Sequence, residues 1–319
     1  MESNNGTLQN SLLLTTPQTV ILGLYCTLVT IFGILGNSTV VYSSIRYNSI
    51  KLDSISLLFI QHLAVADLLY VIIMVLPITT TLMAGRYVLG AGYCLLSAHF
   101  VTYPGTVNSL IVLSISSYRA RMITSPLSSV SKTHALILLS VIWVVGYAGT
   151  VITLAFGSSA ACISSSFTFE SAAARQLPTA TIGILIFLPL MAISVLNPIQ
   201  VVAIKNSRRF GKFPNYWGSV TVYCISGLFL ISWFPYVVHT LCKSVGIQTH
   251  PALQLIAYYS NFLNTFCNPI LYTLTNRRFG RFVKGLISSV ICCTYFWKSD
   301  PKRRSNLKMT STSHDAKDS

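Results

Sequence analysis

Seven long apolar runs constrain this chain more than any other feature of its sequence. They cover residues 18–45, 54–83, 92–122, 133–156, 177–204, 216–242 and 251–274. Each exceeds the roughly 20 residues that a helix needs to cross the hydrocarbon core of a bilayer, and the connections between them are short. The sequence therefore predicts an all-α membrane protein, a bundle of seven transmembrane helices (18–274) with no sizeable soluble domain.

The basic residues are unevenly distributed over the connections. Of 22 Lys and Arg residues, only Arg86, Arg175 and Lys243 fall on one side of the predicted bundle. Because Lys and Arg accumulate in cytoplasmic loops, this pattern predicts an extracellular N-terminus and a plasma-membrane protein. The net charge of +15 does not indicate a nucleic-acid partner, because the charges lie in loops and tails rather than on a folded basic surface.

The two tails are polar and differ in character. Residues 1–17 carry no basic leader, so we expect the first run itself to direct insertion rather than a cleaved signal peptide. Asn5 begins a glycosylation sequon on the side predicted to be extracellular. Residues 292–319 mix Ser and Thr with Lys and Arg and are predicted to be disordered.

The third run joins two chemically distinct ends. It begins near Cys94 and stays free of acids and bases until Arg119. About 25 residues at 1.5 Å each span about 37 Å, so each end can meet one aqueous face. The pattern predicts a tethered outer end and an inner end that binds a partner.

Polar residues inside the runs point to a site at mid-membrane depth. Asp67 is the one acid well inside a predicted span, and Asn264 and Asn268 lie four residues apart on one face of another. Pro269 breaks the hydrogen-bond pattern of the same helix. Asp67 is either a buried neutral carboxyl or part of an ion or switch site, and the amides favour the second interpretation.

The sixth run contains a candidate lever. Trp233 stands two residues before Pro235, with Phe229 one turn earlier. A proline inside a helix produces a bend, and a bulky indole beside it would move with that bend. A tryptophan that only packs against lipid or a neighbouring helix is the plainer alternative.

Taken together, these residues resemble the rhodopsin-like, or class A, G-protein-coupled receptor family. The resemblance covers all seven runs, and the strongest part is Asn268-Pro269 through Tyr272 followed by Asn276 to Phe279. It rests on the following positions in order: Gly36-Asn37, Leu63 to Leu68, Cys94, Arg119 with Pro126, Trp143, Pro189, Trp233 with Pro235, and Asn268-Pro269 with Tyr272.

The resemblance implies a receptor in which an extracellular agonist favours an outward swing of the sixth helix, and Arg119 then meets a heterotrimeric G protein. It implies an allosteric sodium ion at Asp67, Asn108, Asn264 and Asn268, with Asn108 in place of the usual serine. It also implies a disulfide between Cys94 and Cys162, and docking of arrestin after a receptor kinase acts on the tail.

A basic, amphipathic stretch over residues 275–291 resembles an eighth helix lying on the membrane surface, in contact with lipid. Cys292 and Cys293 follow it and resemble a palmitoylation site. Two ordinary free thiols are the alternative.

Three departures from the family pattern affect the predicted switch. Tyr118 stands where the family usually has an acid that pairs with Arg119, and residues 213–218 contain no acid either. Asn197 stands where a tyrosine usually supports the active state. We expect either a loosely held resting state with raised basal signalling or weakened coupling.

The candidate ligand-binding residues are aromatic or neutral, and no acid faces the expected pocket. This pattern disfavours an amine ligand and suits a weakly polar small molecule, a lipid or a short peptide end. Phe262 replaces the retinal-binding lysine of light receptors, which disfavours an opsin. The candidates are Val101, Thr102, Gly105, Tyr236, His239, Thr240, Gln254, Tyr258 and Phe262.

Other classes of protein remain as alternatives. A decoy receptor that binds ligand without recruiting G protein is favoured by Tyr118 and Asn197. A chemosensory receptor of a divergent lineage is a second alternative, and a transporter or channel would require paired charges or broken repeated helices. The sequence has no metal-ligand cluster, phosphate loop or nucleophile motif, so we expect no enzyme.

Overall fold

The computed structural model describes residues 16–46, 54–90, 92–93, 96, 103–124, 130–156, 176–209 and 216–299. Several predicted site residues lie outside these ranges: Asn5, Cys94, Val101, Thr102 and Cys162, together with the side chains of Cys292 and Cys293.

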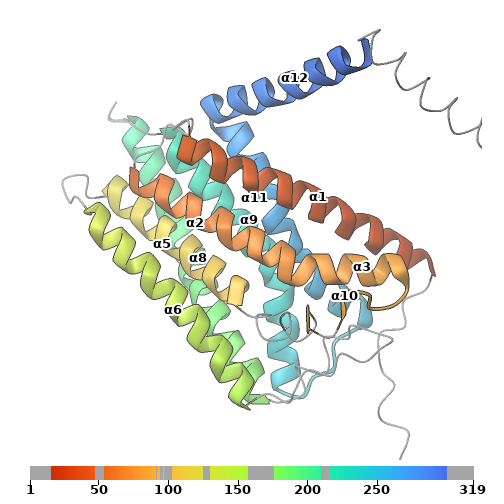
Figure 1. The fold of residues 1–319 in the computed structure, drawn as a ribbon. Coiled ribbons are helices and arrows are strands. Elements are labelled where there is room, and N and C mark those ends of the chain that lie inside the picture. The colour runs from red at the N-terminus through yellow and green to blue at the C-terminus, as the bar shows by residue number, and fades with distance from the viewer. Residues whose placement is uncertain are drawn as a thin grey trace, which may run out of the picture.

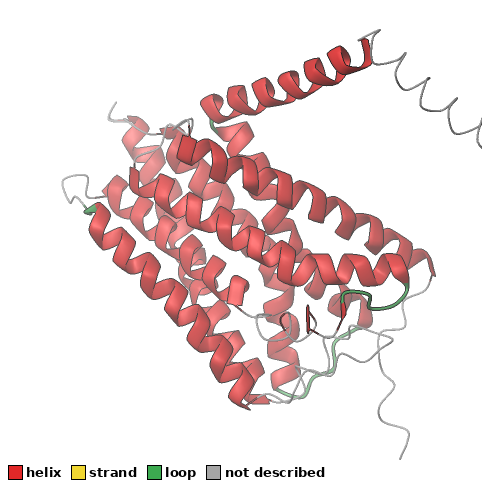
Figure 2. Cartoon of the chain, viewed as in Figure 1, coloured by secondary structure: helices red, strands yellow, loops and turns green. Residues whose placement is uncertain are grey.

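Throughout the described residues every regular element is a helix (Figures 1 and 2). The elements are α1 (Thr16–Arg46), α2 (Ser54–Tyr70), the π-helix η1 (Val71–Val75), α3 (Leu76–Ala84), α5 (Tyr103–Thr124), α6 (Lys132–Phe156), α8 (Gln176–Arg209), α9 (Tyr216–Ser244), α10 (Pro251–Ser260), α11 (Phe262–Thr275) and α12 (Arg277–Ser299).

The helices pack into one bundle around α5, which contacts α2, α6, α8 and α9. In Figure 1, α1 and α2 run side by side in opposite directions, and α6 lies along one edge. Below, the end of the bundle where α5 ends and α9 begins is called the Arg119 end, and the other the opposite end.

Part of the bundle is apolar enough to cross a membrane by length and composition alone. Among the described residues these segments are Pro17–Ile45, Ser54–Ala84, Lys132–Val151 and Gly218–Cys242, and Ile186–Val202 is a shorter apolar helix. The central helix α5 does not belong to this group because it carries polar residues, which it buries against its neighbours: Thr106, Asn108, Ser109 and Ser116. A helix surrounded by other helices needs less apolar surface than one that faces lipid.

The second apolar run contains a π-helical turn that the sequence did not reveal. The N–H of Leu76 donates to the carbonyl oxygen of Val71, five residues back. In the same register the carbonyl of Ile72 would need the N–H of residue 77, which is a proline. The hydroxyl of Tyr93 donates to that oxygen of Ile72 instead.

The seventh run is two helices rather than one continuous helix. It breaks at Asn261, where the backbone N–H donates to the carbonyl of Tyr259 in a tightened turn. Pro269 lies inside α11. The hydroxyl of Ser260, beside the break, donates to the carbonyl of Ser232 at 2.8 Å and ties α10 to α9.

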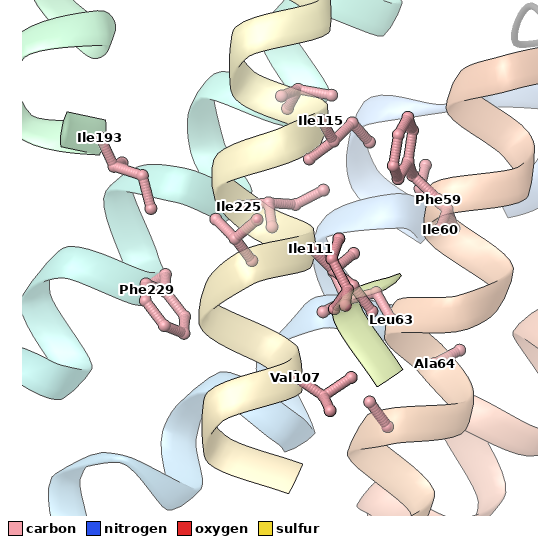
Figure 3. Packing of buried hydrophobic residues seen from close by; sticks show 14 of the residues in the cluster. Phe59, Ile60, Leu63, Ala64, Val107, Ile111, Ile115, Ile193, Ile225 and Phe229 are labelled. Carbon is pink, nitrogen blue, oxygen red and sulfur yellow. The ribbon is translucent and has the colours of Figure 1, made fainter. Parts of the chain in front are cut away.

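The apolar core lies between α2, α5, α8 and α9. Figure 3 shows Phe59 and Leu63 of α2, Ile111 of α5, and Ile225 and Phe229 of α9 within this cluster. A second cluster joins α1, η1 and α11 around Val71 and Phe262, among others. Burial of these side chains fixes the rotation of each helix and therefore the direction of its polar residues.

A sharp elbow separates α12 from the bundle, and in Figure 1 α12 projects away from it. Asn276 has extended backbone angles, and its side-chain oxygen accepts a hydrogen bond from the N–H of Phe279 at 3.1 Å. The ring of Phe279 packs edge-on against Tyr272. α12 continues to Ser299, so residues 292–299, expected in the disordered tail, are helical. Its contact with lipid stays a prediction.

Candidate functional site

The carboxyl group of Asp67 lies at the centre of a buried polar cluster built by three helices. Its side chain is fully buried in α2. The amide nitrogen of Asn108 in α5 donates to Oδ1 at 2.9 Å, and that of Asn268 in α11 donates to Oδ2 at 2.8 Å. Such bonds to a carboxylate are stronger than bonds between neutral groups. The predicted meeting of these three residues is therefore present in the fold.

Thr265 also belongs to this cluster, although the sequence did not single it out. Its hydroxyl lies 3.4 Å from Asp67 Oδ1, a long and weak hydrogen bond. Thr265 precedes Asn268 by three residues, so both lie on one face of α11. That spacing is the signal that could have identified it.

Amide oxygens without a hydrogen-bond partner belong to three of the predicted site residues, and two of these residues turn their amide nitrogen toward the carboxylate. These oxygens are Oδ1 of Asn108 and Oδ1 of Asn268, and Asn264 has neither its oxygen nor its nitrogen paired. The Asn264 side chain is 1% exposed. Buried polar groups are nearly always paired, so these oxygens indicate a place for a water or a cation. A carboxylate with several amide oxygens fits the preference of hard cations for oxygen ligands.

Asn37 completes the hydrogen bonding of the helix that carries the cluster. Pro269 has no N–H to give the carbonyl of Thr265, four residues earlier. The side-chain amide of Asn37 in α1 donates to that carbonyl at 2.9 Å. The two helices can approach because a Cβ added to Gly36 would lie 2.8 Å from the ring of Pro269.

Trp233 sits in an aromatic column along α9. Its ring centroid lies 5.7 Å from that of Phe229, four residues earlier, and 5.7 Å from that of Tyr236, three residues later. The ring of Tyr70 in α2 lies 6.3 Å away. A Cβ added to Gly105 of α5 would lie 2.8 Å from the indole. Gly105, predicted to contact ligand, thus packs directly against Trp233.

Four of the predicted ligand residues meet near the opposite end of the bundle. The hydroxyl of Tyr258 lies 3.3 Å from Nε2 of His239, and Tyr236 packs against the Tyr258 ring. Thr249, which we had not expected here, joins this group because its hydroxyl lies 2.7 Å from Nδ1 of His239. Its carbonyl accepts from the side chain of Gln254 at 3.0 Å.

Two further predicted ligand residues are buried close to this group. Thr240 follows His239 on α9 and is buried. Phe262 is 1% exposed and packs edge-on against Tyr70 and Tyr259. Phe262 therefore belongs to the second apolar cluster, where it packs against the ring of Tyr70.

Several contacts at the Arg119 end join neutral groups of neighbouring helices. Arg119 is 3% exposed, and the ring of the preceding Tyr118 packs against Phe59 of α2. The amide of Gln200 in α8 donates to the carbonyl of Ser116 at 3.1 Å. Tyr272 is buried beneath the elbow to α12.

Two more hydrogen bonds at this end join α9 to its neighbours. The hydroxyl of Ser226 in α9 donates to Oδ1 of Asn197 in α8 at 2.8 Å. The hydroxyl of Thr221 donates to that of Thr275 in α11 at 2.8 Å. The sequence drew attention to Asn197 alone among these four, and only as a departure from a pattern.

Comparison with known families decides the class of this chain. The family described as 7 transmembrane receptor (rhodopsin family) matches residues 36–272, which is more than two thirds of the chain. The chain belongs to the rhodopsin family of seven-transmembrane receptors. As a member of this family with apolar helices, the receptor is a multi-pass protein of the plasma membrane, and its relatives are receptors rather than enzymes.

Individual relatives are distant from this receptor. Galanin receptor 2b of Danio rerio is 25% identical in a comparison over 300 residues, which covers 86% of this chain and 77% of the relative. The Gq-coupled rhodopsin of Mizuhopecten yessoensis is 25% identical over 317 residues, 86% of this chain and 60% of the relative. G-protein coupled receptor 52 of Mus musculus is 27% identical over 105 residues, 32% of this chain and 29% of the relative. The receptor thus spans less than two thirds of the length of several relatives that it matches.

Proposed function

We propose that this receptor converts the binding of an extracellular ligand into activation of a heterotrimeric G protein. In this proposal the Arg119 end is cytoplasmic and the opposite end receives the ligand. The aromatic column Tyr236, Trp233 and Phe229 is the observation that carries the proposal, because it begins at Tyr236 among the candidate ligand residues and runs along α9 toward the Arg119 end. Pro235 lies within the same helix and provides a point of bending.

The candidate ligand-binding side chains near the opposite end suit a ligand without a positive charge. Among the described candidates, the side chains are aromatic rings, hydroxyls, an amide and an imidazole, as in Tyr236, Thr240, Gln254 and His239. No carboxylate among them would hold an amine. A weakly polar small molecule, a lipid or a short peptide end suits this surface. Two of the relatives above are named for galanin and for rhodopsin, which does not narrow this choice.

A sodium ion at the Asp67 cluster would favour the resting arrangement. Asp67 would supply the charge, and Asn108, Asn264 and Asn268 would supply neutral oxygens. The unpaired amide oxygens described above support this part of the proposal. An agonist that expels the ion then shifts the population toward the open state, since it binds that state better.

The other features implied by the resemblance stay predictions. They are the Cys94–Cys162 disulfide, glycosylation at Asn5, lipidation at Cys292 and Cys293, and docking of arrestin after phosphorylation by a receptor kinase.

Ligand-free signalling in cells tests the main proposal. Wild type, Tyr118→Asp and Arg119→Ala are compared at matched surface expression, with sensors for each G-protein family. Arg121→Ala serves as the control, because it removes an exposed arginine two residues away. We expect wild-type basal activity that both Tyr118→Asp and Arg119→Ala reduce and Arg121→Ala preserves.

A decoy receptor is the second candidate, favoured by Tyr118 and Asn197 at positions where the family usually has an acid and a tyrosine. It predicts no response of any G protein in wild type, with or without a bound ligand. Direct binding of a ligand to the purified receptor, together with this silence, would replace the main proposal with the decoy.

A further inference from the structure

The α9 helix is fastened from two sides at the Arg119 end by side chains that carry no charge. Ser226 bonds to Asn197 of α8, and Thr221 bonds to Thr275 of α11, both at 2.8 Å. Ser226 is fully buried, and Thr221 and Asn197 are almost completely buried. The Ser226 hydroxyl also lies within hydrogen-bond distance of the carbonyls of Val222 and Tyr223. Separation of this pair therefore leaves Oδ1 of Asn197, rather than the hydroxyl, without its partner.

The two bonds restrain different motions. Ser226 and Thr221 are five residues apart, so they point about 140° apart around α9 and are separated by about 7.5 Å along it. A movement of α9 away from α11 breaks the threonine pair. A rotation of α9, or a slide against α8, breaks the Asn197–Ser226 pair. Because the two bonds lie on different sides of α9, together they restrain the helix more than either bond does alone.

The sequence lacks a charged latch at this end. Tyr118 replaces the acid before Arg119, and its ring packs against Phe59. The segment 213–218 also has no acid. Neither place provides a carboxylate for Arg119, yet α9 makes one buried and one partly buried hydrogen bond to its neighbours.

We propose that the Asn197–Ser226 and Thr221–Thr275 pairs are the resting-state latch of this receptor. This inference rests on the proposed function, in which α9 moves outward at the Arg119 end. It adds a neutral latch, which limits basal activity, to a resting state that lacks a charged one. Because no charge takes part, salt screens the latch little and titration near neutral pH does not release it.

The latch predicts specific energetic behaviour. The loss of one buried hydrogen bond raises the ratio of open to closed receptor about fivefold. Asn197→Ala, Ser226→Ala and the double variant should have the same effect, because each removes the same bond. Thr275→Val removes the other bond, so its effect multiplies with that of Ser226→Ala.

Spin-label distances in the purified, full-length receptor test the latch without a G protein. Labels are placed at Thr133 of α6 and Tyr223 of α9, both exposed, after replacement of the accessible native cysteines. The receptor is measured in nanodiscs without ligand. We expect a longer-distance population that grows about fivefold in each single latch variant.

Conservative variants separate the latch from simple misfolding. Ser226→Thr and Thr275→Ser keep the hydroxyls, and both should resemble wild type. Ser43→Ala is the matched control, because Ser43 is fully buried and bonds only within its own helix, to the carbonyl of Val40. It should leave the distances unchanged.

Two outcomes would overturn the inference. One is an unchanged distance distribution in both Ser226→Ala and Thr275→Val. The other is additive effects of Asn197→Ala and Ser226→Ala, which would mean that they do not share a bond. A shift in distance without any G-protein activation in cells would instead support the latch and reject the proposed function.

Discussion

The side-chain amide of Asn37 donates to the main-chain carbonyl of Thr265, the oxygen that Pro269 leaves without its helical partner. One asparagine in α1 thus supplies the hydrogen bond that proline removes from α11. The same helix α11 carries Asn268 toward Asp67. Contacts of this kind make the polar cluster depend on helices that are far apart in sequence.

Replacement of Asn37 by alanine should destabilise the receptor by about 1–3 kcal/mol, because a buried carbonyl loses its partner. Thermal and chemical unfolding in detergent measures this loss. Thr39→Val is the control, since the exposed Thr39 hydroxyl bonds only to Leu35 of its own helix. An Asn37→Ala receptor as stable as Thr39→Val would contradict the prediction.

Gly36→Ala should destabilise the α1–α11 contact by about 1–3 kcal/mol. The new methyl group would lie 2.8 Å from a rigid proline ring, so the two helices must separate. Gly227→Ala makes the same change at a helical glycine with no neighbour within 4 Å. That control should gain about 0.5–1 kcal/mol, and the opposite signs are measured by unfolding of the two variants side by side.

Gly105→Ala should displace Trp233 and raise ligand-free signalling. The added methyl group meets the indole at 2.8 Å, and the Trp233 ring leaves its place between Phe229 and Tyr236. Tryptophan fluorescence and a basal G-protein assay report the two effects together.

Gly146→Ala provides the comparison for this change. Its methyl group would lie 2.6 Å from Val107 in the interface between α5 and α6. The indole of Trp233 is not among the atoms nearest to that methyl group. It should lower stability by a similar amount, about 1–3 kcal/mol, without raising signalling. Equal signalling by both variants would remove the special role of the Gly105–Trp233 contact.

Sodium chloride should stabilise the receptor against heat more than choline chloride does at equal ionic strength. Binding of an ion to the folded state alone raises its stability in proportion to the logarithm of ion concentration. Asp67→Asn should abolish the difference between the two salts, and Asn264→Ala should reduce it. A wild-type receptor with the same melting temperature in both salts would exclude a sodium site at this cluster.

The sequence predicted the helical bundle and the main members of its polar cluster for physical reasons. A run of apolar residues must be a helix in lipid, since its backbone has no water to bond with. Asp67, Asn264 and Asn268 could be selected because polar groups in such runs are costly and turn inward, whereas Asn108 was selected only through the resemblance to the receptor family.

The contacts that join the helices could not be predicted in the same way. The pairing of Asn197 with Ser226 depends on the rotation and depth of two helices, and a helix that is apolar on all sides has no periodicity to set either. The break at Asn261 arises from a local turn, which no proline or glycine marks in the sequence. The place of Thr249 beside His239 depends on how the connection between α9 and α10 folds back.

The π-helical turn at Val71–Val75 divides one membrane-crossing helix into two parts with separate registers. Removal of a single residue there would restore an ordinary helix but rotate Leu76–Ala84 by about 100° relative to Asp67. The extra residue therefore fixes which side chains of Leu76–Ala84 face the bundle, while Ser54–Tyr70 keeps Asp67 in place.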